Sequence, residues 1–256
     1  MKCSRSLWSF RFLASGLHCL LSLVVALAAA ILVFGFWYPY PYREISSGRE
    51  LFLLVVSVDV ILGPLITLMI VNRNKSKQEL CGDLLVVGLI QVAALGYGLW
   101  TVAIARPVHM VFEYDRFRVV HAIEVDPTLL RGSSARIVAL PLSGPTLLAL
   151  RPFRDEQEKM EATMAALQGV SLASRPELWI PYEEATAAVL KYAQPAEQLL
   201  NRFSASANDI RQTLHGVGRA PQDVVYLPLV GRKSFWTVFL DPVTAQVLVT
   251  MPLDSF

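Results

Sequence analysis

Asp59 is the residue whose type and position predict the most unusual chemistry, because it is the one ionisable side chain in the apolar run Leu51–Val71. As an α-helix this run is about 31 Å long, enough to cross a hydrocarbon core of ~30 Å. A carboxyl group near the middle of such a helix costs on the order of 2.5–3.5 kcal/mol to insert. Water cannot offset that cost at this depth. The sequence therefore predicts that another helix, a water-filled cavity or protonation does so.

The pair Gly63-Pro64 follows Asp59 by one helical turn and predicts a notch beside the carboxyl group. Asp59, Gly63 and Ile66 have the spacing i, i+4, i+7, which places them on one helix face. Pro64 has no N–H to donate to the carbonyl of Val60, so an acceptor is left open there. Three roles are consistent with this arrangement: docking of a partner helix, contact among the chain's own helices, and conduction of protons or ions. No further acidic residues in the apolar segments suggest a relay for conduction.

A later apolar segment, Leu84–Ala105, also carries residues suited to close helix packing. Gln91 lies near its middle, and Ala94 and Gly98 have the spacing of small residues at helix contacts in membranes. These residues share a face, and Gln91 is the first candidate for an intramolecular partner of Asp59. The predicted helix-docking residues are Asp59, Gly63, Pro64, Gln91, Ala94 and Gly98.

The first apolar segment, Leu13–Phe36, follows the basic residues Lys2, Arg5 and Arg11. It is longer than the roughly 7–15 residues of a cleavable signal peptide, so we expect an uncleaved membrane span. The chain is 54% hydrophobic with a mean hydropathy of +0.46, which favours a membrane protein with a soluble portion. We therefore predict a membrane domain over residues 1–105, with spans at about 13–36, 51–71 and 84–105, and a soluble α+β domain over residues 106–256.

The distribution of charge predicts an orientation. The N-terminal stretch has three basic residues and no acidic ones, and the second loop clusters Arg73, Lys75 and Lys77, whereas the first loop balances two arginines against two glutamates. The positive-inside rule then places the N-terminus in the cytoplasm and the residues after Arg106 outside. In a bacterium this is a multi-pass protein of the inner membrane with a periplasmic domain. That domain is nearly neutral and carries no basic face typical of nucleic-acid binding.

Aromatic residues dominate the start of the first loop, Trp37–Glu50. Trp and Tyr are enriched at membrane interfaces, so anchoring is the favoured interpretation and recognition of a partner is the alternative. The residues that we expect on an outer interaction surface are Trp37, Tyr38, Tyr40, Tyr42, Arg106, Phe112, Asp115 and Arg116.

The rest of the chain alternates strand and helix signals. The expected strands are Val108–Tyr114, Phe117–Val125, Ile137–Leu140, Val224–Leu229, Ser234–Leu240 and Gln246–Met251, with a tight turn at Asp115-Arg116. The expected helices are Asp155–Gln168, Tyr182–Phe203 with an interruption at Pro195, and Asn208–His215. Pro195 suits the first turn of a second helix after the interruption. Strands at both ends with helices between them indicate a compact α+β domain.

Two clusters of titratable residues accompany the first expected hairpin. A metal or acid-base site is conceivable there, but the solvated face of a hairpin is the favoured interpretation. The sequence has no HExxH, no G-x-S-x-G and no phosphate-binding glycine loop. We therefore predict no catalytic residue, no bound metal and no cofactor. The two clusters are His109, Glu113 and Asp115, and His121, Glu124 and Asp126.

Several stretches are typical of a known family: Asp59–Leu65 (DVILGPL), Gln91–Tyr97 (QVAALGY), Ala105–Val120 (ARPVHMVFEYDRFRVV), Tyr226–Leu229, Trp236–Asp241 and Leu253-Asp254. Through them the chain resembles the type IV pilin accessory proteins of the TfpX/TfpZ (FimB-like) family. The resemblance implies a non-enzymatic factor of the bacterial inner membrane that acts on the pilin subunit. Such a factor affects pilus assembly or the balance of extension and retraction.

The expected partners are therefore the major pilin, the pilus assembly machinery and the lipid bilayer, without nucleic acid. The alternative from another class is a membrane-tethered periplasmic sensor or regulator that signals through a separate protein. A membrane-bound hydrolase is the third class, and nothing in the sequence favours it.

Overall fold

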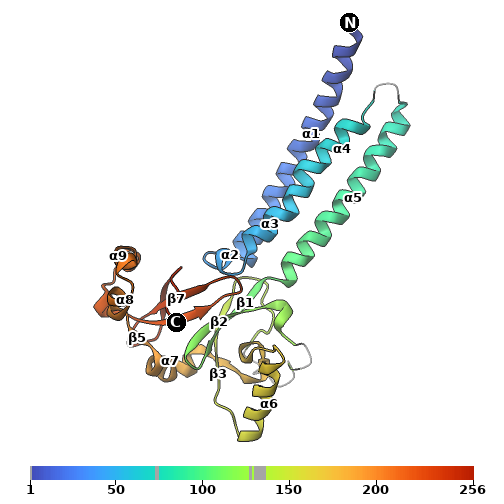
Figure 1. Ribbon diagram of the computed structural model, residues 1–256. Helices are drawn as coiled ribbons and strands as arrows, with labels where there is room; N and C mark the ends of the chain where they lie inside the picture. The colour runs from blue at the N-terminus through green and yellow to red at the C-terminus, as the bar shows by residue number, and fades with distance from the viewer. Residues whose placement is uncertain (1, 73–74, 127–128, 130–136) are drawn as a thin grey trace. The chain divides into compact units, whose positions relative to one another are not determined.

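A computed structural model describes residues 2–72, 75–126, 129 and 137–256, with side chains from Ser9 onward. Arg73 of the predicted basic loop lies outside these residues. The chain divides into two compact units (Figure 1). The helical unit comprises Met1–Pro39 and Gly48–Ile104, and the sheet unit comprises Tyr40–Ser47 and Ala105–Phe256.

The helical unit contains three stretches that are long and apolar enough to cross a membrane: Ser9–Trp37, Gly48–Ile70 and Lys77–Ile104. This finding confirms the prediction of three long apolar helices. The first is α1 (Lys2–Leu32) with the π-helical turn η1 (Val33–Trp37), and the second joins α3 (Gly48–Ser57), the π-helical turn η2 (Val58–Leu62) and α4 (Gly63–Ile70). The third is α5 (Lys77–Ile104).

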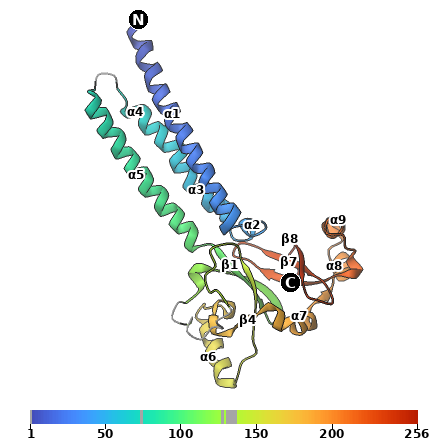
Figure 2. The ribbon, with the colours of Figure 1, turned by 180° about the vertical axis from the view of Figure 1, so that it is seen from behind.

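The rod formed by α3, η2 and α4 lies between α1 and α5 in both views (Figures 1 and 2). Helix α1 packs along α4 and η2, and α5 packs along α3 and α4. A small core at one end of this unit buries Val33, Tyr38 and Val102. The Tyr38 hydroxyl donates a hydrogen bond to the carbonyl oxygen of Val102 at 3.1 Å, which joins the end of the first span to the third.

The sheet unit contains a mixed sheet, with eight strands assigned over the described residues. They are β1 (Pro107–Glu113), β2 (Arg116–His121), β3 (Thr146–Leu150), β4 (Trp179–Pro181), β5 (Gln194–Pro195), β6 (Val225–Val230), β7 (Phe235–Leu240) and β8 (Val247–Met251). Their order is β4-β3-β1-β2-β6-β7-β8, with β5 on β6. The pairs β1–β3 and β2–β6 are parallel and the other pairs are antiparallel.

Helices and short turns connect the strands. The α-helices of this unit are α2 (Tyr42–Ile45), α6 (Glu156–Leu167), α7 (Thr186–Tyr192), α8 (Glu197–Arg202) and α9 (Ala207–Gly216). The 3-10 turns are η3 (Ala122–Glu124), η5 (Leu172–Ser174), η6 (Pro176–Leu178), η7 (Tyr182–Ala185), η8 (Ser204–Ser206) and η9 (Pro221–Asp223). Three apolar helices followed by a domain of sheet and helices confirm the predicted fold class.

Strand β1 is buried on both faces, which explains its nearly continuous apolar sequence, whereas β2 carries Arg116 and Arg118 at half-buried positions of one face. Met110 and Phe117 belong to one core cluster, and Val111 and Val120 belong to another. A third cluster lies where α8 and α9 pack near β6, β7 and β8. The helices of this unit therefore cover the sheet, while the strands supply most of the buried core residues.

The loop between the first two apolar helices belongs to the core of the sheet unit. Ile45 of α2 is fully buried in the same cluster as Met110, and the Tyr42 hydroxyl contacts Met110 Sδ at 3.5 Å. Gly231 leaves room for Ile45, because a Cβ atom at position 231 would collide with the Ile45 side chain. Burial also raises the pKa of Tyr42 to about 12. The expected membrane domain had included this loop, whereas its contacts in the structure are those of a core segment.

Three details of the sheet unit differ from the predictions. The first turn is Tyr114-Asp115, not Asp115-Arg116, because Glu113 pairs with Arg116 and Tyr114 takes a left-handed φ of 62°. Residues 137–140 form no strand, and the strand that pairs with β1 on this side is β3 (Thr146–Leu150) instead. Pro195 does not begin a helix. It lies in β5 at the edge of β6, where the missing N–H of proline is tolerated.

Candidate functional site

Asp59 lies in the π-helical turn of the second apolar helix, and its side chain is buried with 8% of its surface exposed. In a π turn the carbonyl of residue i faces the N–H of residue i+5, and for Asp59 that residue is Pro64, which has none. The pair Gly63-Pro64 thus accounts for the irregular turn. Among the described residues, no hydrogen-bond donor pairs with Asp59 Oδ1. An unpaired buried carboxyl oxygen lowers the stability of the fold, so such a group is usually retained only where it has a function.

Gln91 reaches Asp59 from α5, but it contacts the backbone and not the carboxyl group. Its Nε2 atom donates to the Asp59 carbonyl oxygen at 3.4 Å. The open acceptor predicted from the sequence is the carbonyl of Val60, which applies to an α-helical turn. The π-helical turn moves the affected acceptor back by one residue.

The small residues of the predicted docking set are used in contacts within the helical unit. A Cβ atom at Gly63 would collide with the side chain of Gln91, and one at Gly98 would collide with Val55. Pro64 is buried, and its carbonyl oxygen accepts a hydrogen bond from Ser15 Oγ at 2.8 Å. Ala94 and Gly98 line a cavity of about 260 Å³ between the second apolar helix and α5, and Asp59 borders this cavity too. Helix α5 therefore packs closely against the second apolar helix of this chain.

A larger groove opens over Asp59 between α1 and α5. It has a volume of about 420 Å³ and is lined mostly by apolar side chains. Its lining residues on α1 are Ala14, Leu17, His18, Leu21, Ser22 and Val25, those on the middle helix are Asp59 and Thr67, and those on α5 are Leu84, Gly88, Gln91, Val92 and Leu95. We call it the α1–α5 groove.

Three polar residues of this groove are not among the predicted docking residues: His18, Ser22 and Thr67. His18 Nδ1 lies 2.6 Å from Thr67 Oγ1. The prediction had placed Ile66 on the face of Asp59, but Ile66 is exposed and Thr67 is buried. One wide π turn and one α turn together take about eight residues, which brings position 67 and not position 66 onto this face. The i, i+4 spacing of His18 and Ser22 was the available signal.

The predicted outer surface residues fall into buried and exposed groups. Tyr38 and Phe112 are buried, and Trp37 and Tyr42 are half-buried. Tyr40 is 63% exposed, and Asp115 and Arg116 form an ion pair of 2.6 Å at the β1–β2 turn. The Arg116 guanidinium also lies 5.0 Å from the centre of the Phe256 ring. Arg106 donates to the carbonyl oxygen of Pro141 at 3.2–3.3 Å.

His109 is not on a solvated face of the hairpin, contrary to the favoured interpretation. It is fully buried, and its Nε2 atom lies 2.8 Å from the carbonyl oxygen of Ala139, which fixes this nitrogen as the donor. Its Nδ1 atom lies 2.7 Å from Thr146 Oγ1. Burial lowers the pKa of His109 to about 4, so this histidine is neutral near pH 7. Both ring nitrogens are satisfied, which is the pattern of a structural residue.

His121 borders a polar pocket of about 390 Å³ on the sheet unit. Its Nδ1 atom lies 3.1 Å from Glu124 Oε1, and Arg232 contacts the same carboxylate at 3.2 Å. Burial alone would raise the pKa of Glu124, but the hydrogen bonds from His121 and Arg232 hold it below its ordinary value. The described residues contain no group of three histidine, cysteine or acidic side chains that could hold a metal ion.

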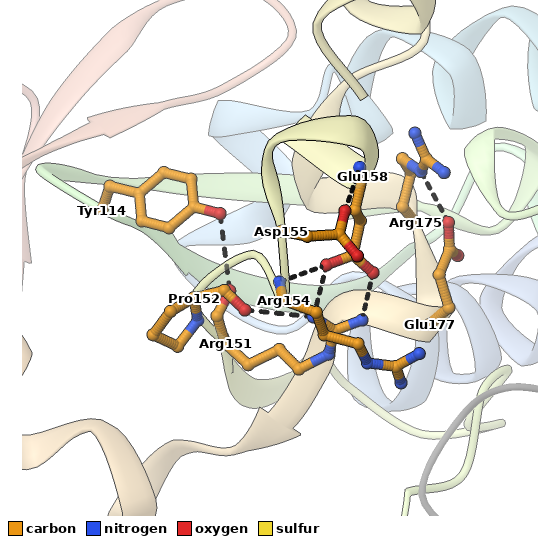
Figure 3. Close-up of polar contacts among 8 residues, drawn as sticks. All are labelled: Tyr114, Arg151, Pro152, Arg154, Asp155, Glu158, Arg175 and Glu177. Carbon is orange, nitrogen blue, oxygen red and sulfur yellow. Dashed lines mark hydrogen bonds and ion pairs between the residues drawn. The ribbon is translucent and has the colours of Figure 1, made fainter. Parts of the chain in front are cut away.

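A second polar cluster surrounds the start of α6 (Figure 3). Arg151 holds Glu158 with two hydrogen bonds of 2.6 and 2.8 Å, and the Asp155 side chain caps the helix by accepting from the Glu158 N–H at 2.7 Å. The Arg151 guanidinium lowers the pKa of Glu158 to about 2. Nearby, Arg175 and Glu177 form an ion pair of 2.6 Å. These charges pair with one another, so the cluster fixes the link between β3 and α6.

The structure thus defines a class of protein with three apolar, membrane-length helices and a separate globular unit. Comparisons with known proteins specify the family. The family model of the fimbrial assembly protein FimB matches residues 6–47, which cover α1 and the first loop. None of the stretches on which we based the resemblance lies in this range. No solved structure matches the chain.

Two relatives from Dichelobacter nodosus extend over nearly the whole chain. The fimbrial assembly proteins of serogroups E1 and I are each 34% identical over 244 residues, which is 94% of this chain and 95% of each relative. The fimbrial assembly protein of serogroups C1 and C2 is 42% identical over 106 residues, 41% of this chain and 81% of that relative. This chain therefore belongs to the FimB family of fimbrial assembly proteins, and it has a role in pilus biogenesis.

Proposed function

We propose that this protein is a non-enzymatic accessory factor of the inner membrane that acts on the type IV pilin subunit and modulates pilus assembly or the balance of extension and retraction. The observation that carries the proposal is Asp59, a buried carboxyl group without a partner for Oδ1 among the described residues, in an apolar groove. A group of this kind is costly in a membrane-length helix and suits a contact made only when a partner is present.

The two units suit two contacts with one partner. A pilin subunit before assembly has an apolar helix in the membrane and a head domain outside it. In our proposal the helices around Asp59, Gly63 and Gln91 contact the pilin helix, and the sheet unit contacts the head. This arrangement requires the N-terminus in the cytoplasm and the sheet unit in the periplasm, as the distribution of basic residues predicts.

The surface around the β1–β2 turn is our candidate for the contact with the pilin head. A shallow pocket of about 440 Å³ opens there, lined by charged and aromatic side chains including Asp115, Arg116 and Tyr192. Arg and Tyr are enriched in protein interfaces because they combine a large contact area with directional hydrogen bonds. The mutual pairing of Asp115 and Arg116 is exposed, so it can be exchanged for contacts with a partner at little cost.

Crosslinking in living cells tests the proposal. A photo-crosslinking residue replaces Tyr192 in the sheet unit, and another replaces Val92 in the helical unit, because both side chains are exposed. We expect the pilin as the main adduct at both positions, identified by mass. Position 63 is unsuitable for a probe because Gly63 is packed against Gln91. If neither probe labels the pilin, and another membrane protein is captured instead, the proposal is wrong.

A genetic experiment separates assembly from retraction. Deletion of the gene should reduce the number of surface pili in normal cells. If the defect disappears in cells that cannot retract pili, the protein acts on the balance of extension and retraction. If the defect persists there, it acts on assembly. An unchanged number of pili in both backgrounds would contradict the proposed function.

One observation favours the second candidate function, a membrane-tethered periplasmic sensor or regulator. The pocket at His121 is polar, and it is bordered by Gly231, against which the loop residue Ile45 packs. A small ligand there would contact a segment joined to the loop between the first two spans. Native mass spectrometry of the purified protein tests this function. A retained small molecule that is lost in Arg232→Ala favours the sensor over the pilin factor.

A further inference from the structure

We infer that the α1–α5 groove receives one transmembrane helix of the partner, and that this helix presents a hydrogen-bond donor at the depth of Asp59. The inference rests on the proposed function, because it takes the occupant to be the membrane helix of the pilin. It goes further by assigning the face of the helical unit that the occupant contacts, and the chemistry that it must bring.

The lining of the groove has the spacing of a helix-packing seam on both walls. On α1 the lining residues are 14, 17, 18, 21, 22 and 25, and on α5 they are 84, 88, 91, 92 and 95. Intervals of three and four residues are the spacing at which one helix packs along another. Each seam is about 17 Å long at 1.5 Å per residue, or roughly three turns. A groove of this length and regularity matches the side of a helix better than a compact small molecule.

The architecture leaves a place for a fourth helix. Helix α1 packs on α4 and η2, and α5 packs on α3 and α4, so both outer helices rest on the middle rod. The groove is the space above that rod, walled by α1 and α5. A helix placed there would contact α1, the middle helix and α5 together, as each helix in a four-helix bundle contacts its neighbours.

Asp59 specifies what the occupant must carry. Three other polar residues of the groove have partners within the helical unit, since His18 contacts Thr67 and Gln91 donates to the Asp59 carbonyl oxygen. Asp59 Oδ1 lacks one among the described residues. A carboxylate accepts hydrogen bonds, so the complementary group is a donor such as a hydroxyl, an amide or an ammonium group. An entirely apolar helix would leave this oxygen without a partner.

The predicted docking residues Gly63 and Gly98 are not on this surface. Their faces are filled by Gln91 and Val55, so they hold the three helices of this chain together. Leu21 and Val92, by contrast, line the groove and are exposed. The docking surface is therefore displaced toward α1 relative to the one expected from the sequence.

Photo-crosslinking with matched positions tests the inference. Val92 and Ile90 lie two residues apart on α5 and are 71% and 63% exposed, but only Val92 lines the groove. Leu21 and Leu23 form the corresponding pair on α1. Probes are placed one at a time in the full-length protein in cells that make pilin. We expect pilin adducts at Val92 and Leu21 that exceed those at Ile90 and Leu23 at least fivefold.

Asp59→Leu tests the required donor, with the probe kept at Val92. We expect the pilin adduct to fall by about threefold to fifteenfold, the range for a hydrogen bond between helices in a membrane. Ser57→Ala is the control, because the Ser57 hydroxyl donates to the Leu54 carbonyl oxygen on an exposed face of the same helix. That variant should leave the adduct unchanged. The amount of each variant in the membrane is measured in the same cells.

Different failures point to different conclusions. Equal labelling of pilin at the groove and control positions, or an unchanged adduct in Asp59→Leu, would overturn the groove as the docking surface. A second copy of this chain or a phospholipid as the main adduct at Val92 and Leu21 would overturn it as well. In each of these cases a pilin adduct at Tyr192 still supports the proposed function. The absence of pilin at Tyr192 as well as in the groove would reject both.

Discussion

His109 in the sheet unit and Asp59 in the helical unit are both buried polar side chains, but their hydrogen bonding differs. His109 contacts Thr146 and the Ala139 carbonyl oxygen through both ring nitrogens. Asp59 Oδ1 has no partner in the part of the chain that the structure describes. A satisfied polar group stabilises a unique core, whereas an unsatisfied one costs stability and persists where function requires it. Hydrogen bonding within the chain thus gives His109 a structural role, whereas the docking role of Asp59 is our proposal.

The largest loss of stability is expected where the first loop enters the core of the sheet unit. Ile45→Ala should lower the free energy of unfolding of this unit by about 2–4 kcal/mol, because Ile45 is fully buried and its removal leaves a cavity. Denaturant unfolding of the full-length protein in detergent, followed by tryptophan fluorescence, measures the change. Ile123→Ala is the matched control, since Ile123 is exposed, and it should change stability by less than about 0.5 kcal/mol. A similar effect of both substitutions would contradict the assignment of the loop to this core.

His109 should make the sheet unit sensitive to acid. Its pKa is lowered from an unfolded value of about 6.5 to about 4 in the folded state. The unfolded state therefore binds the proton more tightly, and the stabilisation present above pH ~6.5 is lost as the pH falls toward 4. The loss is about 3 kcal/mol, since each pKa unit corresponds to about 1.4 kcal/mol.

The His109→Gln variant isolates this effect, because glutamine does not titrate. The difference in stability between the wild type and the variant should shrink as the pH falls from 7 to 4. Trp179, whose ring lies 4.5 Å from the His109 ring, reports unfolding by its fluorescence. A difference in stability that stays constant over this range would show that His109 is not held neutral by burial. His109 could then no longer serve as the structural residue with which Asp59 is compared.

Glu158 provides a smaller test in the same unit. Glu158→Gln should lower stability by about 1–2 kcal/mol, because the carboxylate accepts two hydrogen bonds from the Arg151 guanidinium. Since the pKa of Glu158 is lowered to about 2, its contribution is present above pH ~4.3 and is lost as the pH falls through 2. Thermal unfolding measures both effects. Glu156→Gln, two residues earlier in the same helix and largely exposed, should be close to neutral. Equal effects of the two substitutions would argue against the cluster in Figure 3 as a structural link.

Most of the fold was predictable from the sequence because its signals are local. Apolar runs predicted the three long helices, and alternating residues with turn signals predicted β1, β2, β6, β7 and β8. The short strands β3 and β4 were missed because the pairing of β3 with β1 and of β4 with β3 is set by tertiary contacts. The burial of Ile45 was also unpredictable, since it depends on Gly231, far along the chain.

The candidate site was predicted in part for the same reason. Asp59 was recognisable because a charge in an apolar run is a local signal, and the close approach of Gln91 followed from helix spacing. The role of α1 was not predicted, because no local signal indicates which face of α1 meets the second helix. The π-helical turn at Asp59 then rotated the following residues, so that Thr67 replaced Ile66 on the inner face.

The smallest expected effects on stability test the difference between paired and unpaired polar groups most directly, because two substitutions in the same groove should change stability in opposite directions. Thr67→Val removes a group that contacts His18 at 2.6 Å, and it should destabilise the helical unit by about 0.6 kcal/mol, the average for such contacts in membranes. Asp59→Leu removes an unpaired carboxyl group, and it should instead leave stability unchanged or raise it by about 1 kcal/mol, because a buried polar group without a partner is costly.

Unfolding of the helical unit in mixed detergent micelles, followed by circular dichroism, compares the two variants. The same two variants are scored for surface pili. Asp59→Leu should weaken the contribution to piliation while the protein stays folded, since a docking group is lost without structural damage. If Asp59→Leu destabilises the helices as Thr67→Val does, the carboxyl group is satisfied within this chain, and Asp59 joins His109 as a structural residue.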